Sequence, residues 1–254
     1  AAGGLTLQVG ASAGDSTAGG VVRIAAGSAS GIGEGAAGGD VQISSGHSAG
    51  SASGAVSVRT PDAQSAESGG IALSTGSSDV GAAGGVSIAT GSSAGSSGGA
   101  VSFSVGSSTG ADGGEVNLSG GEALDKGYAG GDVILQAGAG SHAQVGLGGV
   151  VRISAGPSVG SEKQSVGGAL ELSAGKAAGG TGGDVRIESG ESSGVASGVV
   201  DISTAQGKDA ADSGAVRIRT GAVASGAAGP ISLKTGVSEG GQAGSLSFIV
   251  PTFV

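Results

Sequence analysis

The segment Gly85-Val86-Ser87-Ile88-Ala89-Thr90-Gly91 shows a pattern that recurs along the whole chain. Its residues alternate over five positions, which is typical of a half-buried β-strand. Val86, Ile88 and Thr90 point to one face, here called the inward positions, while Ser87 and Ala89 point to the outward face. The glycine that follows favours a turn because glycine readily adopts a positive φ. The segment therefore predicts one short strand followed by a turn.

Sixteen such repeats follow one another, each reading roughly G-x-V-x-I-x-T-G. Nine of the fifteen spacings between them are 15 residues, and the other six are longer. A fixed spacing with insertions is the signature of a repeat protein. No stretch has the 3.6-residue period of an amphipathic helix, so we expect almost no helix. The first two inward residues of the repeats are Leu5/Leu7, Val22/Ile24, Val41/Ile43, Val56/Val58, Ile71/Leu73, Val86/Ile88, Val101/Phe103, Val116/Leu118, Val133/Leu135, Val151/Ile153, Leu170/Leu172, Val185/Ile187, Val200/Ile202, Val216/Ile218, Ile231/Leu233 and Leu246/Phe248.

The composition restricts what kind of core the chain can build. The 254 residues include 60 Gly, no Cys, Met or Trp, one Tyr and three Phe. Because globular cores depend on large side chains, a thick core is excluded, and a thin core between long hydrogen-bond ladders is favoured. The net charge of −9 opposes binding to nucleic acid or anionic membranes. No apolar run approaches the roughly 18 residues that a membrane-spanning helix needs.

We expect the repeats to stack as the successive turns of one long helical path, and each such turn is called a coil. Packing and charge decide how many strands each coil contains. A coil of 15 residues, which resembles the small coils of some insect antifreeze proteins, would leave Val and Ile facing only Gly, Ser and Ala. A coil of about 30 residues with two facing strands lets Val and Ile pack on each other. All six Arg also occupy outward positions of even-numbered repeats, as two faces of different character would require. These residues are Arg23, Arg59, Arg152, Arg186, Arg217 and Arg219.

The prediction is an all-β fold, a single elongated two-sheet β-solenoid with two short strands per coil, formed as one domain over residues 1–254. About eight coils at roughly 4.8 Å each make a rod near 40 Å long. Ile43 should then stack on Leu73, with the intervening repeat on the opposite sheet. The chain resembles β-solenoid proteins as a fold type, over its whole length and without a match to a particular family.

The charged outward residues are the most specific candidate surface. Arg152, Arg186 and Arg217 occupy one outward position in three successive even repeats, with Arg219 and Glu188 beside them. Like charges in one ladder repel each other unless something compensates them. The arrangement predicts either a solvated face with Glu188 as counter-charge, or a contact with an anionic partner or a neighbouring protomer. Lateral packing against the odd face, which would weaken with salt, would use Glu171 and Asp201.

The two ends of the chain lack the polar caps with which solenoids block their open edges. End-to-end stacking is therefore expected, although a fragment of a longer solenoid would look the same. Because the chain begins at Ala1-Ala2 and has no Met, we expect a processed mature chain or a fragment. The residues expected at the stacking ends are Leu5, Leu7, Phe248, Val250 and Phe253.

Other motifs have simpler explanations. Gly182-Gly183-Asp184 resembles the calcium-binding nonapeptide repeat of RTX proteins, but Arg186 occupies the position of its large apolar residue and the period is 15. A carboxylate that is exposed to solvent in a turn explains this motif better than a calcium site. His47 and His142 lie in separate turns, so no metal site is expected. Asn117-Leu118-Ser119 fits a glycosylation sequon, although it lies within a strand.

No serine lies in a nucleophile-elbow context and no glycine-rich loop carries a phosphate-binding lysine, so neither an enzyme nor a cofactor is expected. The chain is expected to be a self-assembling structural subunit of an extracellular or cell-surface fibre or matrix, with itself as partner. The alternatives are a surface-binding module such as an ice-binding protein, or a solenoid segment of a larger adhesin.

Overall fold

The computed structural model describes residues 3–14, 18–31, 33, 35–142, 144–160, 162, 164–208 and 211–250. Within these ranges the chain forms no helix and no β-strand, but extended segments joined by bends and turns. The prediction of an all-β, two-sheet β-solenoid with about eight coils is therefore wrong. Because the described residues form no ladder, Ile43 and Leu73 are not paired in a sheet.

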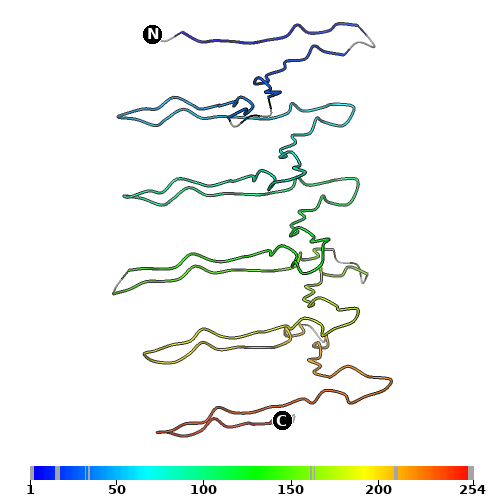
Figure 1. Cartoon of the computed structure of the whole chain (residues 1–254). Coiled ribbons are helices and arrows are strands. Elements are labelled where there is room, and N and C mark those ends of the chain that lie inside the picture. Colours follow the sequence, from blue (N-terminus) through cyan, green and yellow to red (C-terminus); the bar gives the residue numbers. More distant parts are fainter. Residues whose placement is uncertain are drawn as a thin grey trace. The chain divides into compact units, whose positions relative to one another are not determined.

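The chain divides into two compact units, Ala1–Leu118 and Ser119–Val254. In each unit, extended segments carry the apolar residues of the repeats. The loop that connects one repeat to the next is called a linker. In Figure 1 the two stretches of backbone that flank a linker run next to each other, as around residues 41–58 in the first unit. Whether residues 1–254 form one domain stays a prediction.

A hydrogen bond between two glycines closes many of the linkers. In the linker after the third repeat, the Gly54 amide donates to the Gly46 carbonyl at 2.9 Å. Each such bond joins the end of one repeat to the start of the next, so consecutive repeats meet at their linker ends. The solenoid prediction instead separated consecutive repeats onto opposite sheets. Among the described residues, seven bonds of this kind run from Gly39 to Gly27, Gly54 to Gly46, Gly131 to Gly121, Gly149 to Gly138, Gly168 to Gly156, Gly183 to Gly175 and Gly198 to Gly190.

The glycine two positions before the first apolar residue occurs in all sixteen repeats. In most repeats the backbone at this glycine packs against the third inward residue of the preceding repeat, so an added side chain would lie in contact with that residue. A Cβ placed on Gly99 would lie 3.1 Å from Thr90 Cβ, and one on Gly54 would lie 3.2 Å from Ser45 Cβ. The linker that ends at Gly229 is the exception among the described residues, since nothing lies within 4 Å of a Cβ there.

The third inward residue also separates the linkers into two classes. Where it is Ala, Ser or Gly, the two backbones approach closely enough for the glycine pair to bond. Where it is Thr or Val, the described residues form no such backbone bond, and two of these linkers have Pro61 or Ala205 in place of the first glycine. In all of them except the linker that ends at Gly229, a Cγ of the Thr or Val lies within 4 Å of a Cβ placed on the facing glycine. The first class contains Ala26, Ser45, Gly120, Ala137, Ala155, Ala174 and Ser189; the second contains Val9, Thr60, Thr75, Thr90, Val105, Thr204, Thr220 and Thr235.

No described residue is buried, so the expected thin core is absent. Val86 and Ile88, which were expected inside it, are each 61% exposed. The alternating pattern specifies which side chains share a face, but a strand also requires a ladder of hydrogen bonds with a neighbouring segment. Here the backbone bond forms between the glycines of the linker, and the apolar residues beyond it have no ladder. The half-buried residues are Ser48, Thr60, Ala123, Ala137 and Gly207.

Candidate functional site

The largest shared feature of the described surface is the set of first and second apolar residues of the repeats, which we call the apolar stripe. All of these side chains are exposed. In fourteen of the sixteen repeats the second residue is more exposed than the first, as in the third repeat, where Val41 is 54% and Ile43 is 74% exposed. The stripe therefore presents its Ile, Leu and Phe residues to the surroundings more than its Val residues.

This degree of exposure is unusual for residues of this type. Val, Ile, Leu and Phe are among the residues most often found in protein interiors. A single exposed apolar side chain needs no explanation, but exposed apolar side chains that recur in pairs at every repeat favour a role in interaction. The stripe recurs at each repeat in both units, and no described part of the chain buries it.

Arg186 forms the one ion pair among the described residues. Its Nη2 lies 3.4 Å from Oδ2 of Asp184, two positions earlier on the same side of the extended segment. Both side chains remain largely exposed, at 83% and 73%, so the pair contributes little to stability. The counter-charge that sequence reasoning assigned to Glu188 is thus supplied by Asp184.

The other charged candidates lie on the surface without ion pairs within the described ranges. The sequence placed the arginines, here called the basic row, and Glu171 and Asp201, here called the acidic row, on opposite faces of a thin rod. Because the two sheets are absent, these opposite faces are absent too. A contact role for these residues stays a prediction. They are Arg152, Arg217, Arg219, Glu171 and Asp201.

The residues expected at the stacking ends are exposed where the structure describes them. Leu5 and Leu7 lie near the start of the first unit, and Phe248 and Val250 near the end of the second. Phe253 lies outside the described residues. End-to-end contact stays a prediction, but without coils it lacks the open sheet edges that suggested it.

In at least six linkers of the described part of the chain, a serine hydroxyl caps the loop, which sequence reasoning missed. Ser48 Oγ accepts a hydrogen bond from the Ser51 amide, and Ser78 Oγ accepts one from the Gly81 amide. Each of these serines stands seven positions after the first apolar residue, a regularity that the repeat alignment alone could have shown. The six serines are Ser48, Ser78, Ser93, Ser108, Ser192 and Ser238.

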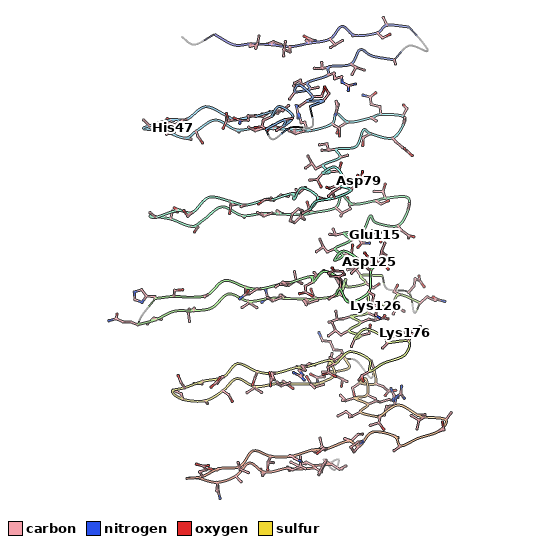
Figure 2. The ribbon with its side chains drawn as sticks, in the orientation of Figure 1. His47, Asp79, Glu115, Asp125, Lys126 and Lys176 are labelled. Atoms are coloured by element: carbon pink, nitrogen blue, oxygen red, sulfur yellow. The ribbon has the colours of Figure 1, made fainter. Side chains whose placement is uncertain are left out.

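One linker uses a histidine for the same purpose. His142 Nδ1 accepts hydrogen bonds from the amides of Gln144 and Val145, each at 3.3 Å. His47 lies at the outer end of a linker of the first unit (Figure 2), next to the capping residue Ser48. The described residues contain no group of three His, Cys, Asp or Glu that could hold a metal ion.

One hollow is lined by the consecutive residues Arg59, Thr60, Pro61 and Asp62, with a volume of about 320 Å³. It is open and gathers no residue from another segment, so it offers no convergent set of catalytic groups. Asn117, the predicted glycosylation position, is exposed, and its modification stays a prediction.

Comparison of the chain with protein-family models, with curated proteins and with solved structures found no match. In the part of the chain that the structure describes, no helix has the length and apolar character needed to cross a membrane.

Proposed function

We propose that the protein is a structural subunit that associates with further copies of itself, and that association covers the apolar stripe. The observation that supports this most strongly is the exposure of the apolar residues in all sixteen repeats. Burying apolar surface is favourable by roughly 25 cal/mol per Å². The free energy gained by burial is largest when every repeat of the stripe meets an apolar residue of the partner, which requires a partner surface with the same spacing.

A second copy of the chain fits this requirement because it carries the same stripe with the same spacing. Nine of the fifteen repeat spacings are identical, so two copies can match several apolar residues in one register. Where two copies pair with an offset of one or more repeats, part of each stripe stays uncovered, so the contact does not close on itself and further copies add to form fibres or sheets. We expect such a fibre or matrix to function outside the cell or on its surface.

Two variants with equal added charge test the proposal. The first replaces the second apolar residue in three consecutive repeats with Asp, at Ile43, Val58 and Leu73. The second makes the same change at the neighbouring outward residues Gln42, Ser57 and Ala72. Only the first variant places carboxylates on the stripe, where they would have to be desolvated on contact.

Association is measured by sedimentation velocity over a concentration series, with negative-stain micrographs of the same samples. We expect the natural chain and the outward variant to form large assemblies, and the stripe variant to remain monomeric at the same concentrations. If the natural chain stays monomeric throughout, or if both variants assemble equally well, the proposal is wrong.

A further inference from the structure

The linker between Gly138 and Gly149 is closed at three successive levels. At its base, the Gly149 amide donates to the Gly138 carbonyl at 2.9 Å. Further out, Gly140 lies so close to the Gly146-Leu147 backbone that a Cβ on Gly140 would collide with it. At the tip, His142 Nδ1 accepts the hydrogen bonds from Gln144 and Val145.

The tip depends on the protonation state of one side chain. A neutral imidazole has one nitrogen that accepts and one that donates, whereas a charged imidazole has two donors. Since Nδ1 accepts both bonds, the proton of the neutral ring belongs on Nε2. A second proton would occupy Nδ1, and its N–H would then face two backbone N–H groups.

The sequence on either side of His142 carries no charged side chain that would offset this effect. Residues 133–151 contain no Asp, Glu, Lys or Arg, and the first charged residues on either side are Asp132 and Arg152. In the six serine-capped linkers the accepting group is a hydroxyl, which neither gains nor loses a proton between about pH 5 and 8. Imidazole side chains, by contrast, change charge between about pH 5 and 8.

We propose that the linker between Gly138 and Gly149 is a proton-sensitive turn, held closed by neutral His142 and opened when the imidazole gains a proton. The sign follows from the acceptor role of Nδ1, because only the unprotonated ring can cap the loop. The closed tip therefore requires the neutral ring, and the gain of a proton on Nδ1 removes both hydrogen bonds. Opening leaves a cationic side chain in a stretch that is otherwise uncharged.

The experiment uses ¹⁵N NMR of the full chain, in solution or as solid assemblies, between pH 5 and 8. His47→Ser leaves His142 as the one histidine, so its ring signals are unambiguous. In this background we expect the Nε2-protonated form at pH 8. We also expect the Gln144 and Val145 amide signals to shift together with the ring signals as the pH falls.

His142→Ser introduces the residue that caps six of the other linkers. We expect it to keep the Gln144 and Val145 amides in their closed positions and to abolish the shift of these amides with pH. If the ring carries its proton on Nδ1 at pH 8, the inference is overturned. It is equally overturned if the Val145 amide shifts with pH as strongly in His142→Ser as in the natural chain.

Discussion

The third inward side chain and the glycine that faces it control how each linker closes. A β-branched residue adds a Cγ group on the side of the facing glycine, and Val105 Cγ1 would lie 2.8 Å from a Cβ on Gly114. A small residue leaves that space free, as at Ala174, where the Gly183 amide reaches the Gly175 carbonyl at 2.9 Å. The two linker classes thus differ in a Cγ methyl group, which Thr and Val carry and which Ala, Ser and Gly lack.

The substitution Ala174→Thr tests this relation. We expect the longer side chain to separate the backbones and to remove the hydrogen bond from Gly183 to Gly175. A single backbone bond contributes about 0.5–1.5 kcal/mol, so the Gly183 amide should exchange with solvent roughly two to ten times faster. The measurement is hydrogen exchange of the Gly183 amide. Ser173→Thr on the adjacent outward position is the control, and an unchanged Gly183 exchange rate in Ala174→Thr would contradict the relation.

Sequence reasoning identified the positions of the repeats but not the way in which they join. The recurrence of Val86, Ile88 and Thr90 at matching positions could be seen directly, and so could the glycine at Gly84 that precedes them. The dependence of the Gly-to-Gly bond on the third inward residue could not, because it arises from how closely two backbones approach. The recurrence of the capping serines could have been seen in the repeat alignment, but the amide that each serine or His142 binds depends on the path of the loop and could not.

At the level of the elements, each repeat contains an extended segment, as the repeat pattern predicts. The assignment of that segment as a β-strand was wrong. Alternation places Val41 and Ile43 on one side of the segment and Gln42 on the other. Assignment as a strand assumed that neighbouring segments would form ladders and bury this side. In the described residues the segments meet at the linkers, and the side with the apolar residues stays open.

The linkers of each class also occur in blocks along the chain. The five consecutive linkers from Gly121 to Gly198 are all closed by a Gly-to-Gly bond. The three linkers that follow have threonine at the third inward position, and none of them forms this bond among the described residues. Closure therefore changes between regions of the chain and not from one repeat to the next.

For the whole molecule, charge opposes association and apolar contact favours it. Every copy carries a net charge of −9, so two copies repel each other at low ionic strength. The basic and acidic rows suggested the opposite effect, an attraction that salt would weaken. Because Arg186 already pairs with Asp184 of its own chain, less of the basic row is left to attract a neighbour.

We therefore predict that association strengthens as the salt concentration rises. At 0.1 M salt the screening length is about 10 Å, so the repulsion between charges farther apart than this is largely removed. The apolar contact is left in place. Light scattering at fixed protein concentration across a series of NaCl concentrations measures this. Weaker association at higher salt would instead favour contact through the charged rows, and Arg186→Glu would then reduce it further.

The aromatic residues of the chain allow the coverage of the apolar stripe to be measured without any substitution. Phe103 and Phe248 are second apolar residues of their repeats, 74% and 81% exposed, whereas Tyr128 lies in a linker and is 77% exposed. Hydroxyl-radical labelling followed by mass spectrometry, on dilute and on assembled protein, reports the accessibility of each ring. We predict that Phe103 and Phe248 lose most of their labelling on assembly while Tyr128 keeps it. Equal labelling of both phenylalanines in the dilute and the assembled protein would contradict the proposal that association covers the stripe.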